Sequence, residues 1–286
     1  MYFISDLHLC EKKPVARIEK DNDEWWEAQA KCIREIDKIV DGDNLIIAGD
    51  VFDKSKVSNY FINRCIDLFK TLKSKVFVTY GNHDLPTHSL ERRCESALYT
   101  LISSGAVTQL QDELIDGYCV IGEDFGDNTG ECVTGKSIAV VHRYVDNGGS
   151  VFATKEEGID NVYKIYKDKG YGFVVSGDNH QHFIKGGLCN CGSPMRHNWS
   201  QYEHKPVLVK FDGSFTTIPL SFDKDEITNS HIDKVRDKML DDFVDTLVDD
   251  FTVGISFPEN INIFLRENEV DEKIKEKVLL IVNELK

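Results

Sequence analysis

The sequence predicts an α/β fold whose main sheet is parallel. Short unbroken apolar runs, such as residues 45–48 (LIIA), are typical of strands that are buried on both faces. Longer segments with apolar residues at helical spacing lie between these runs, as in residues 25–40, which end just before Gly42. Strand, helix and strand in this order form βαβ units with parallel strands. The 286 residues suffice for one large α/β domain with an appendage.

Each element follows from these patterns. The predicted strands are residues 2–5, 45–48, 75–79, 107–110, 118–121, 137–141 and 171–176. A hairpin of residues 206–211 and 215–220 follows, because Asp212-Gly213 is a favoured turn between two apolar runs. The predicted helices are residues 25–40, 57–72, 90–103 and 155–169, and polar loops cover residues 11–24 and 122–135.

The composition changes after residue 220. Residues 221–286 contain 17 acidic side chains against 9 basic ones, with helical patterning over residues 232–251 and 270–285. We therefore expect one domain over residues 1–220, followed by a small acidic helical module over residues 221–286.

Charge and cysteine usage limit the classes of function. The net charge of −15 argues against autonomous nucleic-acid binding, because phosphate backbones are held mainly by Lys and Arg. The eight cysteines include no CxxC pair and predict reduced thiols in a cytoplasmic protein. No signal-peptide pattern opens the sequence, and no apolar run reaches the ~18 residues of a membrane span, so we expect no membrane association.

Side chains of the kind that bind metals follow five predicted strands. They are Asp6 and His8, Asp50, Asn82 and His83, His142, and Asp178 and His180. In α/β sheets, ligands bind outside the carboxyl ends of the strands. A single acid after Gly49 has a simpler interpretation as the cap of the next helix. Five such strand ends in one chain instead predict a metal centre.

The order of these motifs resembles the calcineurin-like metallophosphoesterase superfamily. Its signature is D-x-H, G-D, G-N-H-D/E, an isolated His and G-H-x-H, and the resemblance covers about residues 1–220. The resemblance implies a four-layer α/β/β/α sandwich that binds two divalent metal ions. Two ions close together can clamp the attacking and leaving oxygens of a phosphate ester. Mixed oxygen and nitrogen ligands suit Mn²⁺, Fe or Zn²⁺ better than Mg²⁺ alone.

The resemblance also implies a role for each residue. Asp50 bridges the two ions; Asp6 and His8 complete the first, and Asn82 and His142 belong to the second. His83 acts on the substrate as general acid or transition-state stabiliser, and Asp84 orients its ring.

The last motif departs from the family pattern. Gly177-Asp178-Asn179-His180 aligns without a gap and puts Asp178 where the family has a His. The alternative alignment uses His180 and His182, which moves the glycine two residues away. His180 is a ligand in both alignments. The gapless one leaves His182 as a substrate contact, and its extra carboxylate favours Mn²⁺.

Two further segments are similar to SbcD-type DNA repair nucleases. One is Gly49-Asp50-Val51-Phe52-Asp53, and the other is Gly192-Ser193-Pro194 followed by Glu203-x-Lys205-Pro206. This similarity implies a DNA exonuclease or endonuclease subunit that works as a dimer with an SbcC-type ATPase. Residues 57–72 and 90–103 are then candidates for the dimer face, and the C-terminal module is a candidate for docking the ATPase.

Other interpretations stay open at this point. The chain could be a stand-alone phosphatase or phosphodiesterase acting on nucleotides or other small esters. Because Asp178 stands where the family has a His, the chain could also be a scaffold protein with a degenerate metal site. Among the basic side chains, Arg143 and Arg196 are candidate contacts to substrate phosphate. His88, His197, His204 and His231 are expected at the surface or in loops, with His197 held open because it follows Gly192-Ser193-Pro194 closely.

Overall fold

The computed structural model describes residues 1–128, 130–131, 136–148, 154–221 and 226–229. The chain divides into two compact units, Met1–Thr228 and Asn229–Lys286. The first unit includes residues beyond 220, because Ile18 N donates to Glu226 O at 3.2 Å and Thr228 N to Ala16 O at 2.7 Å. The helices predicted over residues 232–251 and 270–285 lie outside the described residues and stay predictions.

The first sheet has six strands in the order β12-β11-β1-β2-β3-β4. Their bounds are β1 Tyr2–Ile4, β2 Asn44–Ile47, β3 Lys75–Val78, β4 Thr108–Gln109, β11 Val207–Phe211 and β12 Phe215–Pro219. Strands β1 to β4 are parallel, and β11 pairs antiparallel with both β1 and β12. The predicted parallel sheet and the predicted hairpin are confirmed.

The second sheet has the order β5-β6-β7-β8-β10-β9. Its strands are β5 Asp112–Ile115, β6 Tyr118–Glu123, β7 Ser137–His142, β8 Phe173–Gly177, β9 Phe183–Lys185 and β10 Leu188–Asn190. Strands β6, β7, β8 and β10 are parallel, and β5 and β9 are antiparallel edge strands. The carboxyl ends of β7 and β8 therefore point the same way.

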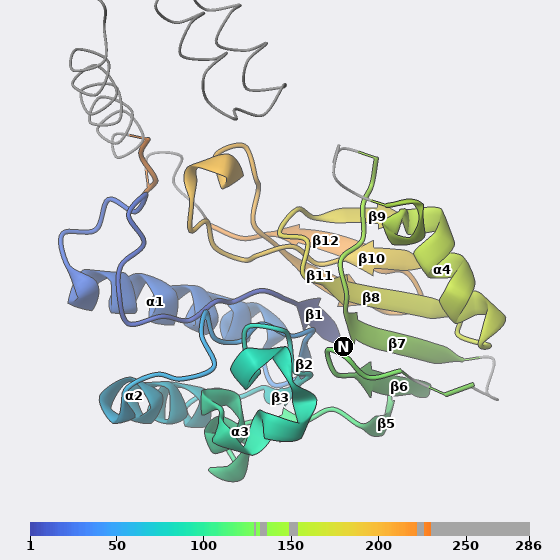
Figure 1. The fold of residues 1–286 in the computed structure, drawn as a ribbon, viewed down its shortest axis with the longest axis horizontal. Coiled ribbons are helices and arrows are strands. Elements are labelled where there is room, and N and C mark those ends of the chain that lie inside the picture. Colours follow the sequence, from blue (N-terminus) through green and yellow to red (C-terminus); the bar gives the residue numbers. More distant parts are fainter. Residues whose placement is uncertain (129, 132–135, 149–153, 222–225, 230–286) are drawn as a thin grey trace, which may run out of the picture. The chain divides into compact units, whose positions relative to one another are not determined.

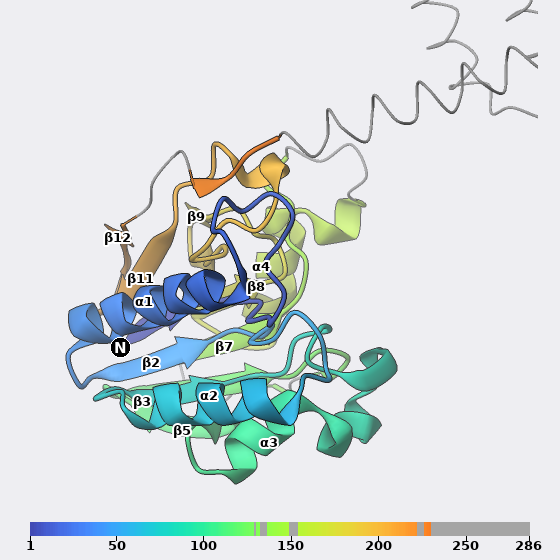
Figure 2. The ribbon, with the colours of Figure 1, turned by 90° about the vertical axis from the view of Figure 1, so that its left-hand side faces the viewer.

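Helices cover the outer face of each sheet, as Figures 1 and 2 show. Helices α1 (Asn22–Val40), α2 (Asn59–Lys70) and α3 (Ala97–Ser103) cover the first sheet, and α4 (Ile159–Asp168) covers the second. None of these described helices has the length and apolar character needed to cross a bilayer.

Alternating side chains divide the core into three layers. Ile4 and Ile47 pack toward α1 and α2, whereas Phe3 and Ile46 pack between the two sheets. On the second sheet, Val174 packs against α4 in the third cluster. A strand between two apolar layers needs apolar residues on both faces, which is why its sequence is a continuous apolar run. The predicted four-layer α/β/β/α sandwich is confirmed.

Several predicted boundaries were wrong for local reasons. Helix α1 begins at Asn22, inside the predicted loop, because the Asp21 side chain accepts from the backbone N–H groups of Asp23 and Glu24 at 3.0 and 2.9 Å. The predicted helix over residues 90–103 is a 3-10 segment and a short α-helix. They are separated by Ser96, whose extended backbone caps α3.

Three short strands, β5, β9 and β10, were not predicted from the sequence. Strand β5 joins β6 through Asp116-Gly117, both with positive φ, which is the two-residue turn that an Asp-Gly pair favours. Strands β9 and β10 are joined by Gly186-Gly187 and have only three residues each, too few to show a period.

Candidate metal centre

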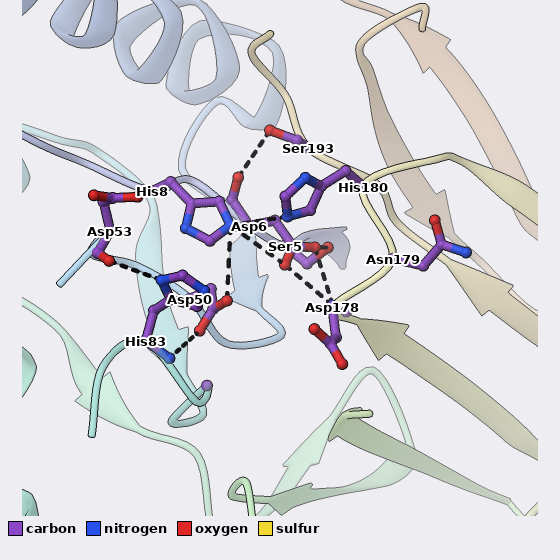
Figure 3. A network of polar contacts seen from close by, with 12 residues as sticks. Ser5, Asp6, His8, Asp50, Asp53, His83, Asp178, Asn179, His180 and Ser193 are labelled. Atoms are coloured by element: carbon purple, nitrogen blue, oxygen red, sulfur yellow. Dashed lines mark hydrogen bonds and ion pairs between the residues drawn. The ribbon is translucent and has the colours of Figure 1, made fainter. Parts of the chain in front are cut away.

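The predicted ligands lie together at the carboxyl ends of strands from both sheets. Strands β1, β2 and β3 contribute from the first sheet, and β7 and β8 from the second. Parallel strands end at one edge of a sheet, so residues far apart in sequence meet there. Figure 3 shows several of these side chains converging from different strands.

One group of potential ligands consists of Asp6, His8 and His180, whose ligand atoms lie within 4.8 Å of one another. The Nε2 atoms of His8 and His180 are 3.0 Å apart. His8 Nε2 is also 3.9 Å from Asp6 Oδ1 and 3.7 Å from Asp50 Oδ2. Asp6 and His8 are buried, so bulk water does not screen this group. The arrangement offers nitrogen and oxygen donors to a single ion.

A second group consists of Asp6, Asp50 and His142. His142 Nε2 lies 3.3 Å from Asp50 Oδ2 and 3.0 Å from the side-chain oxygen of Asn82. The other ring nitrogen of His142, Nδ1, donates to the Ala48 carbonyl at 2.8 Å. That hydrogen bond orients the ring so that Nε2 faces the group, as in metal-binding histidines.

Asp50 belongs to more than one potential ligand group. It is shared between the group with His142 and a third group with His8 and His83. Burial acts to raise the pKa of Asp50, but the neighbouring His142 lowers it more, to about 2. In turn, the negative charge of Asp50 raises the pKa of His142 to about 10, because its effect is larger than the lowering that burial causes. Asp50 is therefore ionised and central, which suits a carboxylate shared by two ions.

Four predicted ligands have left-handed backbone conformations. The φ angles of Asp6, His8, Asp50 and Asp178 are 55°, 46°, 52° and 82°. A residue other than glycine rarely adopts such angles, and each instance costs of the order of 1 kcal/mol or more. Such strain is maintained only where the surrounding structure fixes the residue, and it concentrates at functional sites. Its presence at these strand ends supports a functional centre.

Two glycines of the motifs let the ligand loops approach one another. A Cβ atom on Gly81 would lie 2.0 Å from Asp50 Oδ1. A Cβ atom on Gly49, which has a φ of +81°, would lie 2.2 Å from His142 Nδ1. The glycines of G-D and G-N-H-D are therefore required by the close packing of backbone against ligand side chains.

His83 lies at the exposed edge of the centre. Its backbone N–H donates to Asp50 Oδ1 at 2.9 Å, and its ring Nδ1 donates to the Asp53 carbonyl at 2.7 Å. Burial acts to lower the pKa of His83, but this carbonyl and the charge of Asp50 raise it overall. The ring can therefore carry a proton, with Nε2 remaining to face a substrate.

Asp84 does not orient His83, contrary to the prediction. Its buried carboxylate accepts from the backbone N–H groups of Val51, Phe52 and Gly81 at 3.2, 2.9 and 3.0 Å. Burial, together with the charge of Asp50, raises the pKa of Asp84 to about 7. The reason for the difference is geometric, because Asp84 points inward and joins the two motif loops. The partner of the His83 ring is instead the Asp53 carbonyl.

The donor set fits divalent metal ions. Asp6 and Asp50 are 0% and 1% exposed, and buried carboxylates are costly unless cations or hydrogen bonds compensate them. Burial raises the pKa of Asp6, which shows that its charge is only partly compensated by the protein. Divalent ions held by carboxylate oxygens, an amide oxygen and imidazole nitrogens would supply the missing positive charge.

The model of the calcineurin-like phosphoesterase family matches residues 1–209. The chain belongs to this family. The match covers both sheets up to β11 and includes all the predicted ligands. The phosphoesterase is accordingly a metal-dependent hydrolase of phosphate esters.

Two solved structures that are similar to the phosphoesterase have low sequence identity to it. Protein TT1561 of Thermus thermophilus is 11% identical, with a TM-score of 0.46 over 76% of this chain and 97% of that one. A "Putative 5'-Nucleotidase from Staphylococcus aureus" is 14% identical, with a TM-score of 0.43 over 84% of this chain and 57% of that one. A comparison with curated proteins finds no match.

Asp178 and His182 occupy different surroundings in the phosphoesterase. Asp178 lies beside the centre, where its backbone N–H donates to both oxygens of Asp6 at 3.1 and 3.2 Å. Its carboxylate points away from His8 and His180 (Figure 3). His182 does not join the other ligands, because its ring nitrogens contact Asn190 O and Thr217 Oγ1, both at 2.9 Å. The contacts of His182 argue against the alignment that makes it a ligand, whereas a ligand role for Asp178 stays a prediction.

The structure separates the two predicted substrate arginines. Arg143 directly follows His142, and its side chain lies against the Tyr166 phenol. Arg196 is fully buried, and its guanidinium contacts Glu226 and the Tyr202 carbonyl at 3.0 and 2.9 Å. Arg196 therefore belongs to the core of the segment after β10, where its enclosed guanidinium does not contact solvent, contrary to the prediction of a substrate contact. A buried arginine is retained where carboxylate and carbonyl partners satisfy it.

Two histidines that were expected at the surface, His197 and His204, are partly or wholly buried. His204 is 7% exposed, and its Nε2 contacts the Ser193 carbonyl at 2.7 Å. The ring of His197 lies 5.9 Å from the ring of His8, and burial lowers the pKa of His197 to about 3. His88, in contrast, is exposed as predicted.

Sequence reasoning missed Gln201, which contacts the His180 ring at 2.9 Å. A weak signal was present, because Asn198 and Gln201 have the spacing of a capping box and form one.

Proposed function

We propose that the phosphoesterase is a two-ion phosphodiesterase that processes DNA ends, similar to SbcD-type nucleases. The observation that carries this proposal is the position of the Gly192-Ser193-Pro194 turn. Ser193 Oγ donates to the Asp6 carbonyl at 2.9 Å, and Ser193 N donates to the His180 carbonyl at 3.1 Å. The turn therefore packs on the backbone of two ligand residues, and the segment that resembles SbcD-type nucleases is part of the centre.

A basic pocket beside His83 supports a phosphate-rich substrate. This cavity of about 400 Å³ is lined by Asn82, His83 and His88, together with Asp53, Lys54 and Lys56, so its lysines outnumber its one carboxylate. Cationic side chains here contrast with the net charge of −15 for the chain. Phosphate backbones are held by such groups, so the local charge fits the substrate even though the overall charge does not.

The chemistry can be divided among the residues of the centre. Two bound divalent ions would activate a water molecule and stabilise the charge that develops on the phosphate. Asp50 and His142 hold the ligand geometry, because each is fixed by buried hydrogen bonds. His83 places its ring at the edge of the pocket, with Nδ1 held by Asp53 O, so that a proton on Nε2 can be donated to the leaving oxygen.

The identity of the ions and the cellular setting belong to the same proposal. The centre mixes carboxylate oxygens, an amide oxygen and imidazole nitrogens, which favours Mn²⁺, with Fe, Zn²⁺ or Mg²⁺ as substitutes. Every cysteine among the described residues is a free thiol, in accord with a reducing cytoplasm.

Partners are proposed from the exposed surface and from the acidic charge. Tyr60 on α2 and Tyr99 on α3 are 67% and 41% exposed, which supports these helices as the face of a homodimer. An SbcC-type ATPase subunit would hold the DNA, since an acidic chain grips duplex DNA poorly by itself. Sedimentation of the wild type and of Tyr60→Asp tests the dimer, and loss of the dimer only in the variant supports this face.

A second candidate is hydrolysis of nucleotides or other small phosphate esters by the protein alone. The observation that favours it is the volume of the pocket beside His83, about 400 Å³, because sites for small molecules are typically of roughly 300–1,000 Å³.

One experiment separates these candidates. The purified protein with Mn²⁺ is offered linear duplex DNA, single strands, free nucleotides and bis(p-nitrophenyl) phosphate in parallel. Cleavage of DNA supports the nuclease, whereas turnover of nucleotides alone supports the second candidate. Activity that persists in EDTA would overturn the two-ion mechanism.

A further inference from the structure

A second cavity, of about 380 Å³, lies between the loops that follow β7 and β8. Its lining includes Tyr144, the second residue after His142, and Asn179, which directly precedes His180. Consecutive Cα atoms are 3.8 Å apart, so the wall of the cavity begins within about 8 Å of ligand residues along the chain. The side chain of Asn179 points away from Asp6 and His180 (Figure 3). The second cavity is therefore a neighbour of the metal centre and not part of it.

The charge of the second cavity differs from that of the pocket beside His83. Lys54 and Lys56 line the pocket beside His83. Among the described residues that line the second cavity there is no Lys or Arg, and Asp146 adds a carboxylate. Phosphate groups are held mainly by Lys and Arg, so a phosphate would meet a like charge here and no cation. The second cavity therefore suits an uncharged part of the substrate.

The walls of the second cavity combine aromatic rings with side-chain amides. Tyr144 and Phe183 are half-buried, and the amides of Asn147 and Gln181 are exposed. A side-chain amide can both donate and accept hydrogen bonds. Unpaired nucleobases are recognised by groups of this kind, through stacking on aromatic rings and hydrogen bonds to the edges of the base. A base inside a duplex is stacked and paired, so it could not enter the cavity.

Hydrogen bonds hold the loops around the second cavity in place. Asn179 Nδ2 donates to Val145 O at 2.8 Å, which joins the loop after β7 to the loop after β8. The buried Asn190 donates through Nδ2 to the carbonyls of Asn179 and Gln181, both at 2.6 Å. A site whose loops are already ordered loses less conformational freedom when a ligand binds.

We propose that the second cavity binds an unpaired nucleobase next to the scissile phosphate, with Tyr144 and Phe183 against the base and Gln181 at its edge. The phosphate then lies at the metal centre, and the base lies on the other side of the turn formed by residues 178–180. Single-stranded ends and free nucleotides are therefore better substrates than paired ends. This inference rests on the proposed function, since both of its candidate substrate classes include molecules that carry a phosphate and a base.

Two phosphodiesters with the same leaving group test the cavity. Thymidine 5′-(p-nitrophenyl phosphate) carries a base, and methyl p-nitrophenyl phosphate does not. Removal of an aromatic ring that stacks on a base weakens binding by about 5- to 150-fold. We expect Tyr144→Ala and Phe183→Ala to raise the KM for the thymidine ester by about this factor and to leave the KM and kcat for the methyl ester unchanged. Tyr144→Phe, which keeps the ring, should behave as the wild type.

The matched control is Ile184→Ala. Ile184 follows Phe183 on β9, is 39% exposed, and points to the opposite face of the strand because successive side chains alternate. We expect wild-type KM values for both esters from this variant.

A second measurement does not depend on turnover. A single strand that ends in 5-iodouracil is irradiated with the wild-type protein in EDTA, and the cross-linked peptides are identified by mass spectrometry. We expect adducts on Tyr144 or Phe183 that disappear when the iodouracil is paired in a duplex.

Three results would overturn the inference: a wild-type KM for the thymidine ester in Tyr144→Ala, an equal increase of KM for both esters, or no cross-link in the second cavity. Each of these leaves the proposed function standing if the wild type hydrolyses phosphodiesters with Mn²⁺. A wild type that hydrolyses neither ester nor DNA would overturn the proposed function, and the site of cross-linking would still decide whether the cavity binds a base.

Discussion

Substitution of Gly81 by alanine tests whether the centre depends on the close approach of two loops. The added Cβ would lie 2.0 Å from Asp50 Oδ1 and 2.3 Å from Asp50 N, where ordinary contacts begin at 3.4 Å. The φ angle of Gly81 is not in the left-handed region, so the effect is steric alone. Either the Asp50 loop or the Gly81 loop must therefore move by about 1 Å, a displacement that can lower a rate about 100-fold.

The stability cost follows from overpacking in a buried region. Inserting a methyl group where no space exists costs about 1–3 kcal/mol. For a unit of this size, each kcal/mol lowers the melting temperature by roughly 2–4 °C, so we expect a decrease of roughly 2–12 °C. Turnover of bis(p-nitrophenyl) phosphate, metal content by mass spectrometry and thermal unfolding measure the three effects.

Gly130→Ala is the matched control. A Cβ atom there would have no neighbour within 4 Å, and its φ also lies outside the left-handed region. We expect wild-type behaviour from this variant. Wild-type metal content and turnover in Gly81→Ala would refute the reasoning, because the contact with Asp50 would then not constrain the centre.

Further predictions concern single residues. His83→Ala should keep both ions but lower turnover about 10²- to 10⁴-fold, and loss of metal from this variant would contradict its role. Asp178→Ala should lose metal while His182→Ala keeps it, as measured by metal analysis; the reverse result would favour the other alignment. Arg196→Ala should lower the free energy of unfolding by about 3–5 kcal/mol in denaturant titrations, because a buried pair is broken, while the KM of the folded fraction stays unchanged. In the ion-free protein, the raised pKa of His142 gives stability that is full below pH 6.5 and is lost as the pH rises to about 10. Unfolding curves of His142→Gln against pH should lack this decrease.

Much of the fold could be predicted because buried parallel strands have a strong signal. The runs that became β2, β3 and β7 are apolar on both faces, since the sheets are packed between layers of apolar side chains. Strands β9 and β10 have three residues each and lie at or near an edge, so neither period nor composition marks them. The break at Ser96 was missed because helical spacing continues across it.

The centre could be located from sequence, but its hydrogen bonds could not. Motif order placed Asp6, Asp50 and His142 at neighbouring strand ends, and the structure brings them within 4.8 Å of one another. The partner of the His83 ring is the Asp53 carbonyl and not the predicted Asp84 carboxylate. Every residue has a backbone carbonyl, so the sequence cannot indicate which one accepts this hydrogen bond. Gln201 was missed for a related reason. Its contact with His180 joins two loops, and no local period records such a contact.

The position of β1 has a consequence for how the chain is synthesised. This strand lies between β2 and β11, and Phe3 pairs with Val209. Strand β1 leaves the ribosome long before β11 and therefore waits for one of the last strands of the domain. At about 5–20 residues per second, the edge of β1 stays unpaired for roughly 10–40 s. An open apolar edge during that interval invites pairing with other nascent chains, so yields should depend on chaperones and on translation speed more than on the stability of the finished sheet.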